Sequence, residues 1–209
     1  MKRLVFFLSV LSGVGAGVSH GAPPPAGSVI VRTYNYAAMP AGQLAAAQSE
    51  TTRIFRHAGI TLVWVGCRVP GGDEGSACTE ALHGRVLMLR LVDRTPAQGE
   101  RIVALGESLL DRQERGGVLM TIDMFSVSSV ASGASTSVST LLGRAIAHEM
   151  GHLLLGSAEH PRLGLMRALW SHEEMRGRKQ AYWGFSPREA ARMRQALRAS
   201  APRADAKRG

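Results

Sequence analysis

A short segment with a histidine at each end is the part of this sequence best suited to chemistry. It reads His148-Glu149-Met150-Gly151-His152, with a glutamate directly after the first histidine. Residues four apart lie on the same side of a helix, so both imidazoles can bind one metal ion. The spacing is typical of a zinc-binding helix whose glutamate accepts a proton from a metal-activated water. We therefore expect His148 and His152 to be zinc ligands and Glu149 to be the catalytic base.

A catalytic zinc site usually has a third protein ligand and one open position. The candidates lie beyond Gly156, the residue that we expect to end the helix. His160 is the favoured candidate, because the chain can fold back toward the metal just after Gly156. The sequence leaves several alternatives open, which are Glu159, His172, Glu173 and Glu174.

The helix that carries the two histidines is expected to be buried. Residues 139–155 have helical periodicity and are apolar almost all round, which is typical of a helix inside the core. Polar ring atoms in such a helix need partners. A metal ion would satisfy them. The alternative is a pair of core histidines whose ring nitrogens make ordinary hydrogen bonds.

The segment from His148 to His160 resembles an expanded form of the metzincin site, which reads H-E-x-x-H-x-x-G-x-x-H and precedes a methionine turn. Here Gly156 comes one residue late and His160 two residues late. The segment 164–166 is similar to the turn, and the resemblance implies that Met166 lies beneath the metal. It further implies a zinc metallopeptidase with one Zn²⁺ per chain, which acts as an endopeptidase on proteins or peptides.

The resemblance has a gap at the position that follows the methionine turn. Several metzincins have a tyrosine two residues after the methionine, which stabilises the oxyanion, and this chain has Ala168 there. Tyr182 or Arg167 are possible substitutes. Without such a residue, the chain could instead be a zinc-containing binding protein that has no turnover.

The rest of the chain predicts an α/β (α+β) domain. Helical periodicity and capping signals indicate helices, and β-branched and apolar runs indicate strands. Strands are expected at 28–35, 60–65, 85–92 and 117–125, and helices at 40–57, 139–155 and 186–200. We interpret 102–110 as helix or loop and most of 126–140 as loop. The resemblance implies a twisted mixed sheet of about four to five strands on a backing helix and an active-site helix, plus a C-terminal helix. Its substrate cleft would lie at strand 117–125 or 85–92.

The N-terminal region has the features of an export signal. Lys2 and Arg3 precede an apolar run, 4–18, and small residues follow it. We therefore expect a signal peptide at 1–22, a short proline-rich leader at 23–27 and a secreted or periplasmic protein. The metallopeptidase domain would span 28–200, and a disordered basic tail 201–209. The alternative for the apolar run is a buried first helix or strand.

The two cysteines, Cys67 and Cys78, fit an oxidising compartment. We expect them to form a disulfide, since their spacing suits no zinc knuckle. After the N-terminus no apolar run reaches the length of a bilayer span, so we expect no membrane span in the mature chain.

The net charge of +9 is concentrated in the last part of the chain. From Pro161 onward there are twelve Lys or Arg and four Asp or Glu. Solvated helix faces explain this pattern, although an exported interaction domain for an anionic partner is an alternative. No recognition motif predicts nucleic-acid binding, and we expect a monomer.

Overall fold

The computed structural model describes residues 28–67, 76–79, 85–94, 104–111, 116–177 and 182–200. The expected signal peptide, the leader and the basic tail lie outside these residues, so their assignment stays a prediction. Among the described helices, none has the length and apolar character needed to cross a membrane.

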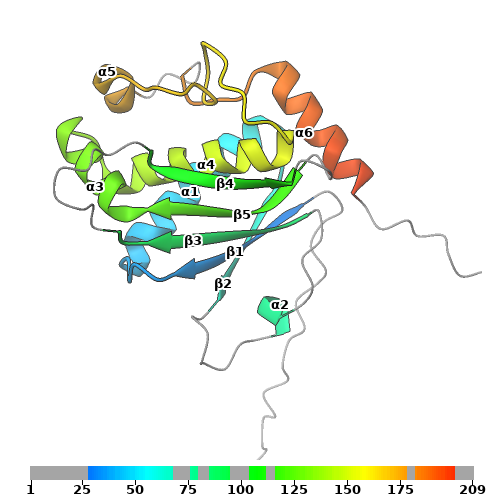
Figure 1. Ribbon diagram of the computed structural model, residues 1–209, viewed down its shortest axis with the longest axis horizontal. Coiled ribbons are helices and arrows are strands. Elements are labelled where there is room, and N and C mark those ends of the chain that lie inside the picture. Colours follow the sequence, from blue (N-terminus) through cyan, green and yellow to red (C-terminus); the bar gives the residue numbers. More distant parts are fainter. Residues whose placement is uncertain are drawn as a thin grey trace, which may run out of the picture.

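The described strands form one five-stranded mixed sheet with the order β2-β1-β3-β5-β4 (Figure 1). The strands are β1 (Val29–Asn35), β2 (Leu62–Cys67), β3 (Val86–Val92), β4 (Gly106–Asp111) and β5 (Gly116–Asp123). Four of them are parallel, whereas β4 runs antiparallel to β5 at the edge. The sheet therefore ends in one antiparallel strand next to the helix that carries the histidines.

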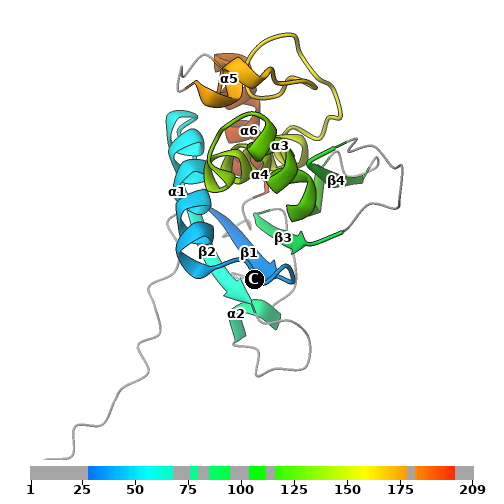
Figure 2. The ribbon, with the colours of Figure 1, turned by 90° about the vertical axis from the view of Figure 1, so that its left-hand side faces the viewer.

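Two long helices pack against the sheet and against each other (Figures 1 and 2). These two helices are α1 (Ala41–His57) and α4 (Val138–Leu155). The other described helices are α2 (Ser76–Thr79), α3 (Met124–Gly133), α5 (His172–Arg176) and α6 (Pro187–Ala199). The central helix α4 contacts α1 on one side and strands β4 and β5 on the other. Its residues from Leu141 to Leu154 are all buried, as the apolar periodicity predicted.

A glycine allows α1 and α4 to approach closely. A Cβ at Gly143 would lie 2.6 Å from the backbone oxygen of Ala47. The hydroxyl of Thr51 on α1 donates a hydrogen bond of 2.9 Å to the backbone oxygen of Gly143. The backing helix thereby fixes the position of the helix that carries the candidate ligands.

The predicted fold class is confirmed, because a mixed sheet packs on a backing helix, a buried central helix and a C-terminal helix. The C-terminal helix α6 begins with the predicted capping box of Ser186 and Glu189. The expected disulfide between Cys67 and Cys78 is also formed, with a Cα–Cα distance of 5.8 Å.

Two of the expected elements were wrong. The segment 102–110, interpreted as helix or loop, contributes strand β4. The segment 126–140, interpreted mostly as loop, contains most of helix α3. Although Ser and Gly are poor helix formers, Asp123 caps α3 by accepting a hydrogen bond from the backbone N–H of Phe125, and Val127 and Ala131 are buried.

The identity of the strand beside the cleft also needs correction. Neither 117–125 nor 85–92 is the edge strand, because β5 and β3 each have neighbours on both sides. The edge strand that lines the cleft is β4. Gly106 allows it to pair tightly, since a Cβ there would lie 2.9 Å from the backbone oxygen of Thr121 on β5.

Candidate active site

The end of helix α4 determines how the chain returns to the two histidines. Gly156 has the left-handed backbone conformation that ends the helix, with φ 60° and ψ 37°. The backbone N–H of Ser157 then bonds to the oxygen of His152. This turn reverses the chain, so that His160 comes back beside the helix.

The structure brings His148, His152 and His160 together. Nε2 of His148 lies 3.0 Å from Nε2 of His152 and 3.3 Å from Nε2 of His160. Within the described parts of the chain, these residues form the one group of three or more His, Cys, Asp or Glu side chains that could hold a metal ion. Of the alternative third ligands, Glu159, His172 and Glu173 are exposed and lie outside this group.

The outward hydrogen bonds of two of these rings fix their tautomers. Nδ1 of His148 lies 3.0 Å from the backbone oxygen of Leu165, and Nδ1 of His152 lies 2.7 Å from that of Ser157. A carbonyl oxygen only accepts, so each Nδ1 carries the proton. The Nε2 lone pairs of both rings therefore point at each other, an arrangement that a shared cation would stabilise.

The spacing of these nitrogens suits zinc. A tetrahedral zinc ion with bonds of about 2.0–2.1 Å to imidazole separates its ligand nitrogens by about 3.3–3.4 Å. The observed separations of 3.0 and 3.3 Å are close to this value. Burial lowers the pKa of His148 to about 4, and burial also lowers that of His160. The neutral ring of His148 at pH 7 is the form that binds a metal.

Glu149 lies beside the histidines and contacts the edge strand. Its carboxylate accepts a hydrogen bond of 2.6 Å at Oε2 from the hydroxyl of Ser108 on β4. Burial raises the pKa of Glu149, and the hydrogen bond from Ser108 acts in the opposite direction. The sequence did not identify Ser108, because its segment was not recognised as a strand.

Met166 lies against the helix between the two histidines. A Cβ at Gly151 would be 2.4 Å from its sulfur, so only glycine leaves room for it. The turn before Met166 contains Gly164, whose φ of 82° is in the left-handed region. The backbone oxygen of Leu165 in this turn accepts from Nδ1 of His148 and from Nε1 of Trp170. The turn thus supports a candidate ligand both by packing and by hydrogen bonding.

A cleft of about 590 Å³ contains the three histidines and Glu149. One wall is formed by residues 104–106, Ser108 and Leu110, in and just before β4. The opposite wall comes from residues 167–170 and Met175, in the segment above α4 in Figure 1. An extended chain laid along β4 would therefore pass the histidines.

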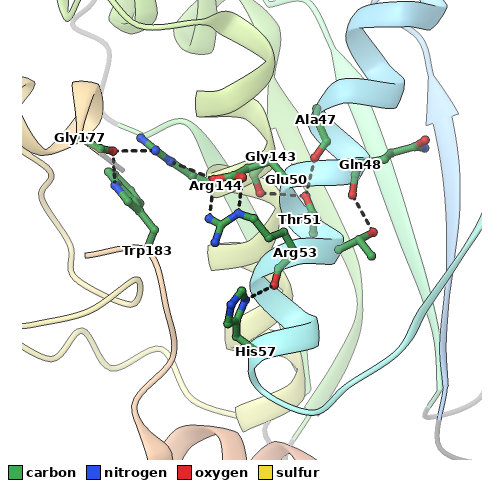
Figure 3. Close-up of polar contacts among 11 residues, drawn as sticks. Ala47, Gln48, Glu50, Thr51, Arg53, His57, Gly143, Arg144, Gly177 and Trp183 are labelled. Carbon is green, nitrogen blue, oxygen red and sulfur yellow. Dashed lines mark hydrogen bonds and ion pairs between the residues drawn. The ribbon is translucent and has the colours of Figure 1, made fainter. Parts of the chain in front are cut away.

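Arg144 connects α4 to the second wall of the cleft, and the sequence analysis did not single it out. It lies one helical turn before His148, and its guanidinium donates to the backbone oxygens of Met175 and Gly177 at 2.6 and 2.8 Å. Figure 3 shows the bond to Gly177. Cζ of Arg144 is 3.8 Å from the ring centroid of Trp183. Arg144 is the one Lys or Arg in a mostly apolar helix, and this was the signal that could have identified it.

The candidate substitutes for the missing tyrosine lie together. Ala168 is exposed and lines the cleft. Arg167 is buried and forms an ion pair with Glu174, and its Cζ lies 5.7 Å from the ring centroid of Tyr182. Arg167 lines the cleft, whereas Tyr182 is not among the lining residues.

The chain has a metzincin-like α/β fold. Its features are the mixed sheet with an antiparallel edge strand, the helix with two histidines, the glycine turn, the third histidine and the methionine turn. The fold is similar to that of archaemetzincin from Methanopyrus kandleri, with a TM-score of 0.53, 13% identity, and coverage of 85% of this chain and 99% of that chain. It is also similar to a zinc-dependent peptidase from Methanocorpusculum labreanum, with a TM-score of 0.50, 11% identity and coverage of 78% and 99%. No family model and no curated protein matches this chain.

Proposed function

We propose that this protein is an exported zinc-dependent endopeptidase. The observation that carries the proposal is the convergence of the Nε2 atoms of His148, His152 and His160 beside the carboxylate of Glu149. In a structural zinc site the protein fills all four ligand positions, whereas a catalytic zinc has three protein ligands and one open position. Here three imidazoles face a cleft large enough for a substrate chain.

His148, His152 and His160 would hold the zinc ion, and Met166 would support them from below. When bound, zinc would act as a Lewis acid, which lowers the pKa of a bound water molecule and polarises the scissile carbonyl. Glu149 accepts the proton from the attacking water and passes it to the leaving amine. Ser108 holds Oε2 of Glu149, so that Oε1 is the oxygen available for this transfer.

Strand β4 is the element best placed to bind a peptide substrate. It has a described neighbour on one side only and forms a wall of the cleft. An extended peptide can add to such an edge through main-chain hydrogen bonds. The substrate would then cross the cleft in front of Glu149, which is connected to β4 through Ser108.

Export is proposed from the N-terminal sequence and from the disulfide. The segment 1–22 has the features of a signal peptide, and the pair Cys67 and Cys78 is joined in the structure. Disulfides persist in secreted and periplasmic proteins and are rare in a reducing cytosol. N-terminal sequencing of the mature protein from its native host tests this part, and a chain that retains residues 1–22 would contradict it.

Peptide hydrolysis by the zinc-loaded protein tests the proposed activity. A quenched peptide library should be cleaved by the wild type and not by Glu149→Gln, which keeps the candidate ligands but removes the base. Glu159→Gln is the matched control, because Glu159 is an exposed neighbour outside the histidine group and should leave cleavage unchanged. Equal cleavage by the wild type and Glu149→Gln would contradict the proposal. Zinc binding without any cleavage would favour the zinc-containing binding protein instead.

A further inference from the structure

Arg167, a residue that lines the candidate active site, has two hydrogen-bond donors that have no partner among the described residues. The side chain is about nine-tenths buried and lines the cleft with the histidines. Its Nε and Nη2 are buried and donate no hydrogen bond within the described structure. Two buried, unsatisfied donors on a charged group are costly, and native proteins rarely keep them without a purpose.

The other contacts of Arg167 hold its guanidinium in place. Nη1 donates to Oε1 of Glu174, and the other oxygen of Glu174 accepts from the backbone N–H and hydroxyl of Ser171 at 2.8 and 2.9 Å. The ring of Tyr182 lies 5.7 Å from Cζ. Glu174 is thus fixed by its role at the start of α5, and it fixes Arg167 in turn.

The free donors lie on one edge of the guanidinium. The N–H groups of Nε and Nη2 point in parallel from the planar group, and this edge matches the two oxygens of a carboxylate. Among the described residues that line the cleft, Arg167 is also the one Lys or Arg and Glu149 is the one acidic residue. Its neighbours on the same wall, Leu169, Trp170 and Met175, are apolar, which strengthens a charge-assisted hydrogen bond.

We propose that the Nε and Nη2 edge of Arg167 binds a carboxylate of the peptide substrate and makes the protein selective for substrates that carry one near the cleaved bond. This inference rests on the proposed function, since it names the substrate class of the same site. The carboxylate can come from the C-terminus of the substrate or from an Asp or Glu side chain. Both sources present the same pair of oxygens, and the experiment distinguishes them.

Binding to a variant without turnover tests this proposal separately from catalysis. The zinc-loaded Glu149→Gln protein is titrated by calorimetry with hexapeptides of Ala and Gly. One set has a free or an amidated C-terminus, and a second, amidated set has Glu or Gln at each position in turn. We expect the carboxylate form to bind at least about ten-fold more tightly than its amide in one set, because the amide has no charge and only one oxygen that can accept from Arg167.

Variants at Arg167 assign the effect to this residue. In the Glu149→Gln background, Arg167→Lys keeps a cation that can pair with Glu174 but lacks the parallel donors, so the preference should fall below about two-fold. Arg162→Met removes the same charge from an exposed position nearby and should keep the preference. Zinc content and thermal unfolding of each variant show whether it is folded and loaded.

The outcomes are distinct. A preference confined to the free C-terminus identifies a terminal carboxylate, and one confined to a Glu position identifies an acidic side chain. Equal binding of every acid and its amide, as expected if the two donors hold only ordered water, would overturn the proposal. So would a preference that survives in Arg167→Lys. If the wild type cleaves no peptide, the binding data still decide the role of Arg167, whereas the proposed peptidase activity fails by itself.

Discussion

The hydroxyl of Ser108 donates a hydrogen bond of 2.6 Å to Oε2 of Glu149 and thereby connects the edge strand to the proposed base. Oγ of Ser108 also lies 2.9 Å from the backbone oxygen of Glu149. A peptide that pairs with β4 would therefore bind next to the residue that positions the carboxylate. In the proposed mechanism, substrate binding and base orientation would depend on the same short strand.

Loss of this hydroxyl should slow catalysis without loss of the metal. For Ser108→Ala we expect kcat to fall about ten- to hundred-fold with little change in KM, because the carboxylate is no longer held in one orientation. Zinc content should stay at the wild-type level. Ser108→Thr, which keeps a hydroxyl, should restore most of kcat, and Ser128→Ala on the exposed side of α3 should have no effect. A normal kcat in Ser108→Ala would show that Glu149 needs no positioning by β4.

A methyl group at position 151 should disturb the support of the histidines. In Gly151→Ala the new Cβ would be 2.4 Å from the sulfur of Met166 and 2.9 Å from Cε1 of Phe185. We expect the free energy of unfolding to fall by about 1–3 kcal/mol and the zinc affinity to decrease, as measured by urea unfolding and by competition with a chelator. The control is Gly42→Ala in α1, where no atom lies within 4 Å. It should be neutral or stabilising, by up to about 1 kcal/mol.

Arg144 should be important for stability. Its side chain is 2% exposed, its guanidinium stacks on Trp183, and it donates to the backbone oxygens of Met175 and Gly177. Figure 3 shows the bond to Gly177. Arg144→Met removes a charge-assisted hydrogen bond from each of these oxygens and from Glu50, which keep Thr136, Trp183 and Arg53 as their other partners. We therefore expect a loss of about 2–3 kcal/mol in urea unfolding. Arg188→Met, at an exposed position, should change the stability by less than about 0.5 kcal/mol. A small effect at Arg144 would mean that water replaces the guanidinium.

Glu50 should make the stability of the protein depend on pH. Burial raises its pKa, but hydrogen bonds and charges from Arg53 and Arg144 outweigh burial, so the pKa lies below its ordinary value of 4.5. A carboxyl group with a lowered pKa in the folded state stabilises the protein above its unfolded pKa. That stabilisation is lost as the pH falls through the folded value.

The comparison of the wild type with Glu50→Gln isolates this contribution. The variant should be less stable by about 1–2 kcal/mol at pH 7, and the difference should disappear at a pH below the folded pKa of Glu50. Urea unfolding of the metal-free proteins between neutral and acidic pH measures it, because metal loss then does not contribute. A difference that is the same at every pH would show that the charge of Glu50 is not responsible.

Local sequence patterns predicted the parts of this molecule that depend on neighbours along the chain. The apolar periodicity of 139–155, the stop at Gly156 and the capping box at Ser186 are signals of this kind, and the helices α4 and α6 follow them. The histidine spacing in a helix similarly predicted that His148 and His152 would face the same point. The position of His160 needed the turn at Gly156 and the resemblance to the metzincin motif.

The elements that were missed depend on contacts between distant segments. Strand β4 has Gly, Glu and Ser at its start and forms because it pairs with β5, not because of its own propensity. Helix α3 is rich in Ser and is stabilised by its cap at Asp123 and by burial. Ser108 and Arg144 act through partners more than 30 residues away, and a single sequence does not reveal such pairs.

Anomalous diffraction from crystals of the zinc-loaded protein tests the central claim most directly. We predict one strong zinc peak per chain, bonded at about 2.0–2.1 Å to Nε2 of His148, His152 and His160. Crystals of a His148→Ala, His152→Ala double variant, grown with zinc in the same way, should show no peak at this place. A wild-type map without a peak among these three rings, or with the ion bound by other side chains, would contradict the account.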